Sequence, residues 1–119
     1  MREGLLNIPT ITGANEVRFS EAIESIIGPI VVVAFKIPDG SGVKVRLEAT
    51  YDNQHWEATA TTNDRDVLLE GNIAKEFKTS AVCNYRVAVY GGQPAQRNMV
   101  EVVWGRYNMS SYFDPQAVV

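Results

Sequence analysis

Apolar and polar side chains alternate without interruption over residues 43–51. The apolar positions are Val43, Val45, Leu47, Ala49 and Tyr51, and the polar positions are Lys44, Arg46, Glu48 and Thr50. A period of two residues places one set of side chains on a core and the other in solvent. Residues 52–55 then form a polar turn sequence, and Trp56 begins a second alternating run. The pattern predicts a β-hairpin in a half-buried antiparallel sheet.

Further segments with strand-like patterns are residues 56–62, 67–69, 81–90 and 99–107. Residues 30–37 are rich in β-branched side chains and apolar at both phases, which predicts a central strand covered on both faces. Turns are predicted where Pro and Gly gather, at residues 38–42 and 91–95. Residues 73–80 are expected to form a loop or a short strand.

Residues 17–27 carry two patterns at once. Their apolar positions fit one face of a helix, which Ser20 could cap and Gly28 could end, and they also fit two short strands. We expect a short helix or a distorted strand here. Together these segments predict an all-β fold, an antiparallel β-sandwich or jelly roll of about seven to eight strands.

The chain is expected to form a single domain over residues 1–119, with a core at about 17–107. Extended arms are predicted at residues 1–16 and 108–119, because both carry apolar or aromatic residues without a regular strand pattern. For the first arm two interpretations remain open. It could lie as a strand on its own domain, or it could dock on another subunit through exposed apolar side chains.

Composition narrows the choice of function. The chain has 119 residues, 45% of them hydrophobic, and a net charge of −3 with scattered basic residues, so we expect no nucleic-acid partner. The longest apolar run, residues 30–37, is too short to span a bilayer, and no signal-peptide pattern is seen. Cys83, the single cysteine, excludes an intramolecular disulfide and is expected to be a packed thiol in a strand.

The chemistry available to an enzyme is sparse. His55 is the only histidine and lies in a predicted turn, so neither a catalytic triad nor a zinc site is expected. Asp64 and Asp66 lack the remainder of a calcium loop, and their segment is expected to be a solvated turn. A carboxylate pair for glycoside hydrolysis would come from Glu48, Glu57 and Glu101, which occupy polar strand positions. We expect no enzymatic activity, no cofactor and no metal.

An aromatic platform for sugar binding is the remaining small-molecule option. It would be built on Tyr51, His55 and Trp56, with Tyr90 and Tyr107 nearby. The strand phase favours the other interpretation, in which Tyr51 and Trp56 are core residues at the end of the sheet.

Two motifs resemble a pattern that is common in structural proteins of tailed bacteriophages. The first is a strand that ends in a Ser/Thr-x-Asp-x-x-x-Trp hairpin, here Thr50, Asp52 and Trp56. The second is a Tyr-Arg-Val-x-Val strand at residues 85–89, followed by a Gly-rich turn at 91–92 and a final apolar strand. The resemblance covers about half of the chain, between residues 43 and 104.

This resemblance implies a small virion protein of the capsid cement or decoration type. Such proteins are β-sandwiches or jelly rolls that clamp neighbouring major capsid subunits with terminal arms. It implies as partners the major capsid protein and further copies of this chain, and a location on the capsid surface after synthesis in the host cytoplasm. The residues expected to contact partners are Leu5, Leu6, Ile8, Ile11, Tyr107, Tyr112 and Phe113. Two alternatives are a receptor- or carbohydrate-binding module, and a head–tail connector or tail component.

Overall fold

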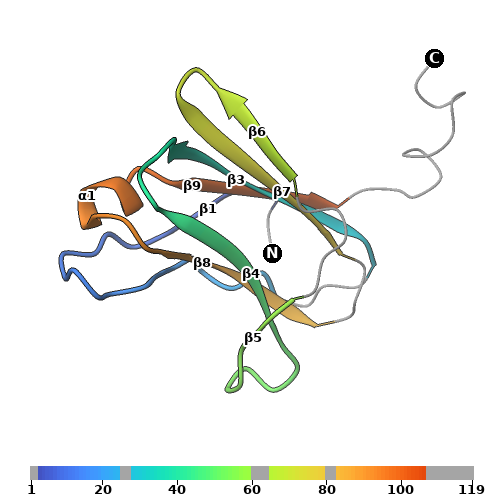
Figure 1. Cartoon of the computed structure of the whole chain (residues 1–119). Coiled ribbons are helices and arrows are strands. Elements are labelled where there is room, and N and C mark those ends of the chain that lie inside the picture. Colours follow the sequence, from blue (N-terminus) through green and yellow to red (C-terminus); the bar gives the residue numbers. More distant parts are fainter. Residues whose placement is uncertain (1–2, 25–27, 60–64, 80–82, 107–119) are drawn as a thin grey trace, which may run out of the picture.

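The structure, a computed structural model, describes residues 3–24, 28–59, 65–79 and 83–106. These residues form two antiparallel β-sheets with nine strands and one short helix (Figure 1). The prediction of an all-β fold is confirmed. The strand count exceeds the expected seven or eight because residues 4–6 and 18–19, which were not assigned to regular strands with certainty, both join a sheet.

The five-stranded sheet has the strand order β1-β9-β3-β7-β6. Its strands are β1 (Gly4–Leu6), β3 (Ile30–Pro38), β6 (Arg65–Leu69), β7 (Asn72–Thr79) and β9 (Glu101–Arg106). The central strand is β3, as its apolar composition predicted, and β9 and β7 pair with it on its two sides. A β-bulge interrupts β3 between Ala34 and Ile37, where Lys36 has a positive φ of 60°.

The four-stranded sheet has the strand order β2-β8-β4-β5. Its strands are β2 (Arg18–Phe19), β4 (Lys44–Thr50), β5 (Glu57–Ala58) and β8 (Asn84–Tyr90). The helix α1 (Pro94–Arg97) joins β8 to β9 and therefore connects the two sheets. It begins inside the segment 91–95 that the Gly/Pro composition assigned to a turn and extends beyond it, and Pro94 is compatible with a helix because it occupies the first turn.

Side chains from both sheets meet in one hydrophobic core. The fully buried members include Val32 and Val102 of the five-stranded sheet, and Leu47 and Val87 of the four-stranded sheet. In each strand these residues alternate with outward-facing ones, so the period of two seen in the sequence sets the inner and outer faces. Cys83 belongs to this core and is a buried free thiol.

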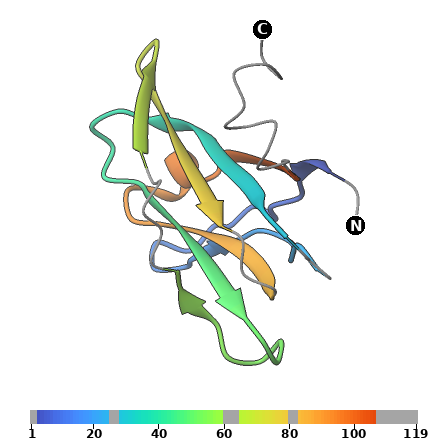
Figure 2. The ribbon, with the colours of Figure 1, turned by 90° about the vertical axis from the view of Figure 1, so that its right-hand side faces the viewer.

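The predicted hairpin is present, but its return strand is short. Strand β4 ends at Thr50, the loop projects beyond both sheets at the lower end of Figures 1 and 2, and β5 contains only Glu57–Ala58. The side chain of Tyr51 is 83% exposed, so its predicted place in the core is wrong. The physical reason is that the chain leaves the sheet at Thr50, where the alternation of faces no longer applies.

Residues 17–24 do not form the helix that was one of the two predictions for residues 17–27. Residues 25–27 lie outside the described part. Instead, β2 pairs with β8, and Ile23 forms a bridge with Tyr85. The Ile23 N–H donates to the Tyr85 carbonyl at 2.7 Å, and the Tyr85 N–H donates to the Ile23 carbonyl at 3.0 Å. The open edge of β8 supplies these partners, and Ile23 is fully buried. Tertiary pairing therefore overrides the local helical pattern.

The segment at residues 73–80, expected to be a loop or short strand, includes most of β7, which runs over Asn72–Thr79. Strand β7 lies between β3 and β6 and pairs with both. Its sequence carries charged residues at inner and outer positions, which hides the strand period. This segment forms a long strand because it pairs with strands on both sides, which the local sequence pattern does not indicate.

Candidate interaction surface

The outer face of the five-stranded sheet, opposite the core, is largely apolar. We name as the apolar face the outward-facing residues Leu5 on β1, Val103 on β9, Val31, Val33 and Phe35 on β3, Ala74 on β7, and Val67 and Leu69 on β6. Leu5 lies opposite Val103, and Val103 lies opposite Val33, so three neighbouring strands present one continuous apolar row. Outward positions of a sheet that faces water are normally polar.

Exposure on the apolar face is highest at the two edges of the sheet. Leu5 is 64% exposed on β1, and Leu69 is 53% and Val67 41% exposed on β6. On β7 the pair Glu76 and Lys78, whose side chains lie 3.4 Å apart, separates these edges in part. Clusters of exposed apolar side chains of this kind are typical of protein–protein contact surfaces.

The outer face of the four-stranded sheet has a different chemistry. The Arg86 guanidinium is stacked between two rings, with its carbon 3.9 Å from the Phe19 centroid and 4.3 Å from the Trp56 centroid. Its Nε donates to Glu48 Oε1 at 2.7 Å, and Arg46 Nε donates to Glu48 Oε2 at 2.8 Å. Trp56 therefore packs on an outer-face arginine, and belongs neither to the core nor to an open platform.

The edges of the two sheets also differ. Strands β2 and β5 contain two residues each and β1 contains three, so these edges offer few free backbone groups. Strand β6 has five residues, with Val67, Leu68 and Leu69 all exposed. Natural sheets usually protect an edge of this length with charges, Pro or a covering segment. In the described part of the chain, β6 is the longest edge strand and the one that exposes the most large apolar side chains.

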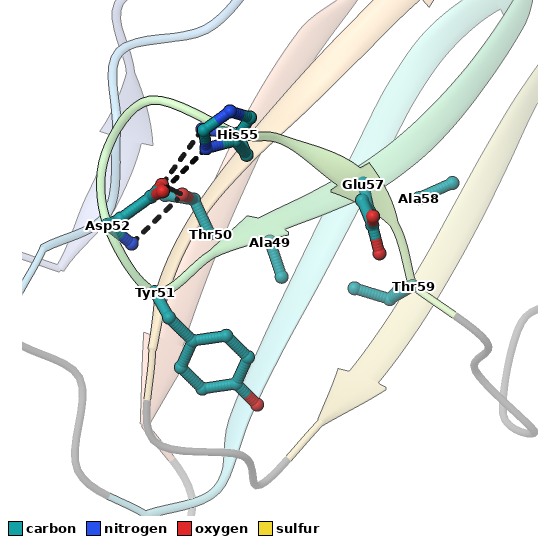
Figure 3. Close-up of a pocket in the computed structure, with 8 residues that line it drawn as sticks. All are labelled: Ala49, Thr50, Tyr51, Asp52, His55, Glu57, Ala58 and Thr59. Atoms are coloured by element: carbon teal, nitrogen blue, oxygen red, sulfur yellow. Dashed lines mark hydrogen bonds and ion pairs between the residues drawn. The ribbon is translucent and has the colours of Figure 1, made fainter.

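The loop between β4 and β5 forms a shallow pocket of about 370 Å³ (Figure 3). Its lining includes the exposed ring of Tyr51, the side chains of Asp52, His55 and Glu57, and Thr59. The Thr59 hydroxyl oxygen is buried without a hydrogen-bond partner. An aromatic ring beside a carboxylate and an unpaired hydroxyl is suited to binding a small polar ligand.

Asp52 organises this loop. Its carboxylate accepts hydrogen bonds from the backbone N–H groups of Gln54 at 2.9 Å and His55 at 2.8 Å, and it lies 2.6 Å from His55 Nδ1. The hydrogen bonds from His55 and Gln54 lower the pKa of Asp52 well below its usual range. The hydrogen bond and the charge of Asp52 raise the pKa of His55. The pair is solvent-exposed.

The three glutamates considered for a catalytic pair do not share one face of a sheet: Glu57 pairs with Ala49, the residue after Glu48, so Glu48 and Glu57 point to opposite faces. Glu48 binds Arg46 and Arg86 on the four-stranded sheet, and Glu57 lies on β5 at the edge of that sheet. Glu101 lies on β9 of the other sheet, where its carboxylate is 2.6 Å from Lys36 Nζ. Across the described residues, no group of three or more His, Cys, Asp or Glu side chains is placed to hold a metal ion.

Of the two aspartates in the predicted turn, Asp64 and Asp66, only Asp66 lies among the described residues. Asp66 lies on β6, with its carboxylate 3.6 Å from Lys75 Nζ, and thus belongs to a strand. Asp64 lies outside the described residues.

The N-terminal segment belongs to its own domain. Leu6 and Ile8 are buried in the core, so as they stand their side chains are not available to a partner, contrary to their expected role. The physical reason is the register of β1 with β9, which turns Leu6 inward and Leu5 outward. Ile11 is partly exposed, and its backbone exchanges two hydrogen bonds with the side chain of Asn98. Of the two interpretations left open, the structure shows a strand on its own domain.

The other expected contact residues, Tyr107, Tyr112 and Phe113, lie outside the described residues. Val33, Val103, Val67 and Leu69 were not among the expected contact residues, although they form much of the apolar face. A signal for this face was present in residues 30–37, which are apolar at both strand phases. The inner set is covered by the opposite sheet, and the outer set forms the middle of the apolar face.

No family model, curated protein sequence or solved structure matched the chain. Among the described residues there is no helix with the length and apolar character that a membrane crossing requires.

Proposed function

We propose that this protein is a structural component of a bacteriophage particle, a capsid cement or decoration protein without enzymatic activity. The observation that carries the proposal is the apolar face, a surface suited to protein contacts on a sheet whose other face is packed in the core. The resemblance of residues 43–104 to phage structural proteins supplies the class of partner. We further propose that the two sheets form a β-sandwich rather than a jelly roll.

The mechanism that we propose is the burial of this surface across subunit boundaries. Each 100 Å² of apolar area removed from water contributes about 2.5 kcal/mol, against which the entropy of association must be set. Repetition over a capsid lattice turns such modest contacts into strong overall binding. The proposed partners are the major capsid protein and copies of this chain. Leu5 and residues 107–119, with Tyr107, Tyr112 and Phe113, stay in the proposed contact set.

Localisation on the virion tests the biological assignment. Virions of the phage that encodes the chain would be labelled with a gold-conjugated antibody raised against the purified protein. Label distributed over the head supports a cement protein. Label confined to the neck or tail would contradict it and support the connector or tail-component alternative, and unlabelled particles that also lack the protein by mass spectrometry would overturn the virion assignment.

Charge substitution tests the surface itself. Val33→Glu and Val103→Glu place carboxylates on the apolar face, and we expect each to weaken binding to capsids of the same phage at least about tenfold, since a buried unpaired charge is strongly unfavourable. The matched control is Lys44→Glu on the outer face of the other sheet, which should bind like the unaltered chain. Equal loss in all three variants, or none in any, would contradict the proposed surface.

A second candidate function is a carbohydrate- or receptor-binding module, and the exposed Tyr51 ring in the loop pocket favours it. In this alternative the ring would stack on a sugar while Glu57 accepts hydrogen bonds from its hydroxyl groups. Glycan-array screening followed by titration calorimetry tests it. Binding that Tyr51→Ala abolishes and Tyr90→Ala preserves would support a sugar site, and absence of any glycan binding would remove it.

A further inference from the structure

Strand β6 is built differently from the other edge strands. It is the outermost strand of the five-stranded sheet, at the margin of that sheet in Figure 1. It exposes three consecutive large apolar side chains, Val67, Leu68 and Leu69, whereas the other three edge strands are only two or three residues long. An edge of this kind pairs readily with another strand.

The turn that joins β6 to β7 shows which backbone groups of β6 point away from β7. The turn residues Glu70 and Gly71 both have positive φ, 48° and 83°, as in a type I′ two-residue turn. The flanking pair Leu69 and Asn72 closes such a turn as a hydrogen-bonded pair, and hydrogen-bonded and non-hydrogen-bonded pairs then alternate along the hairpin. The N–H and C=O groups of Asp66 and Leu68 therefore point away from β7, toward the open edge.

A second copy of β6 fits this edge in one favourable register. A two-fold axis perpendicular to the sheet requires a residue to lie opposite itself. With Val67 on the axis, Asp66 of each copy lies opposite Leu68 of the other, so the outward-pointing backbone groups pair with each other. With Asp66 on the axis two carboxylates would face each other, and with Leu68 on the axis Asp66 would face Glu70, so like charges disfavour both alternatives.

From this register we infer that β6 pairs antiparallel with β6 of a second copy, forming a symmetric dimer with Val67 on the two-fold axis. The two five-stranded sheets then join into one continuous sheet of ten strands. Val67 and Leu69 lie on the apolar face, so dimerisation also joins the apolar faces of the two copies. The inference rests on the part of the proposed function in which copies of this chain bind one another. It does not require that the chain belong to a phage particle.

Disulfide trapping tests the register in the full-length chain. Directly opposite residues in a non-hydrogen-bonded antiparallel pair have Cα atoms about 4.5 Å apart, within the range that a disulfide spans. Val67→Cys should therefore form a covalent dimer under mild oxidation. In the same register the two Leu69 positions are about 14 Å apart along the strands, so Leu69→Cys should cross-link at least about tenfold more slowly.

Two controls accompany the cross-linking, and a second measurement tests the dimer without a disulfide. Leu5→Cys places an exposed thiol on the opposite edge of the same sheet and should stay monomeric on oxidation. The unaltered chain reports on Cys83, which is buried. Sedimentation velocity should show a concentration-dependent dimer for the unaltered chain, with a dissociation constant at least about tenfold weaker in Val67→Lys and unchanged in Leu5→Lys.

Other occupants of the β6 edge would give other results. A chain that is monomeric at all concentrations, with no Val67→Cys cross-link, overturns the inference. So does a dimer in which Leu69→Cys or Leu5→Cys cross-links as fast as Val67→Cys, because this would place the two copies in a different register or on a different surface. A failure of capsid binding with an intact β6 dimer would refute the proposed function alone.

Discussion

Two buried arginines hold the N-terminal segment to the rest of the domain. Arg97 is 2% exposed and donates hydrogen bonds to the carbonyls of Gly91, Gly92, Gly13 and Ala14 at 2.9–3.1 Å. Arg18 is 7% exposed and donates to four further carbonyls, among them those of Ile8 and Pro9. Burial lowers the pKa of Arg18, and the charge of Glu101 opposes that effect. Backbone carbonyls accept hydrogen bonds from both terminal nitrogens of each guanidinium group, whereas the buried Nε of Arg97 has no hydrogen-bond partner.

The first prediction concerns Arg97. We expect Arg97→Met to lower the free energy of unfolding by about 3 kcal/mol, since several buried carbonyls lose a charged donor at once. Arg97→Lys should cost about 2 kcal/mol, because an ammonium group cannot reach both pairs of carbonyls with the geometry of a guanidinium. Urea unfolding measures both values, with exposed Lys44→Met as a control that stays within about 0.5 kcal/mol. A loss below about 1 kcal/mol for Arg97→Met would contradict the anchoring role.

The second prediction concerns the exposed pair of Asp52 and His55. The pKa of His55 is raised in the folded chain. Its contribution to loop stability is therefore complete below the unfolded pKa of 6.5, and is lost as the pH rises through the folded pKa. The lowered pKa of Asp52 gives the opposite pH dependence: the contribution of Asp52 to stability is present above pH 3.8 and is lost as the pH falls. NMR titration of the His55 ring should give a pKa above 6.5 that returns toward 6.5 in Asp52→Asn. An unchanged midpoint in that variant would exclude the pairing.

At the scale of elements, tight turns set the register of the strands that they join. Gly71 in the β6–β7 turn and Gly91 after β8 have similar positive φ values, 83° and 75°. Their surroundings differ. A Cβ at Gly71 would meet nothing within 4 Å, whereas a Cβ at Gly91 would lie 2.4 Å from the Gly42 carbonyl oxygen. The two positions therefore separate backbone strain from steric overlap.

The third prediction uses this contrast. Gly71→Ala should cost about 1 kcal/mol through its positive φ alone. Gly91→Ala should cost about 3 kcal/mol, because the approach of the Gly42 backbone adds overlap that no side-chain rotation can relieve. Thermal and urea unfolding of the two variants measure the difference. Equal losses would mean that the backbone near Gly42 adjusts without cost.

At the scale of the whole molecule, the two outer faces divide the surface by chemistry. One carries the guanidinium and ring stack around Glu48, whose charged and aromatic groups bind one another. The other carries the apolar face, where partly exposed Val33 alternates along β3 with the fully buried Val32 and Ala34. The two outer faces therefore differ in polarity, and the proposed contacts with other proteins use the apolar one.

The fourth prediction tests whether the apolar face is open in the isolated chain. Val32→Ala removes methyl groups from a fully buried site and should cost about 2 kcal/mol. Val33→Ala alters the next residue on the outer face and should cost less than about 1 kcal/mol in the monomer, as measured by urea unfolding at low protein concentration. A loss as large as that of Val32→Ala would show that this face is already covered within the single chain.

Much of this architecture could be predicted because period-two alternation reports the two faces of a strand directly. It identified the strand at residues 44–50, the central position of residues 30–37 and the all-β class. It failed for Tyr51, where the chain leaves the sheet, and for residues 73–80, where charged residues hide the period. It also gave no role to Arg97, whose hydrogen bonds to Gly13 and Ala14 join residues more than 80 positions apart and leave no local pattern.

The sequence by itself determined which side chains alternate, where Gly and Pro permit turns, and that residues 30–37 are apolar on both sides. These are local properties, which follow from the geometry of neighbouring residues. Only the tertiary structure decided that Leu6 faces inward and Leu5 outward, that Ile23 pairs with Tyr85 and not with a helical neighbour, and that β6 lies at the edge of its sheet among the described residues. The physical reason is that register and edge position depend on partners distant in the sequence, which no local pattern encodes.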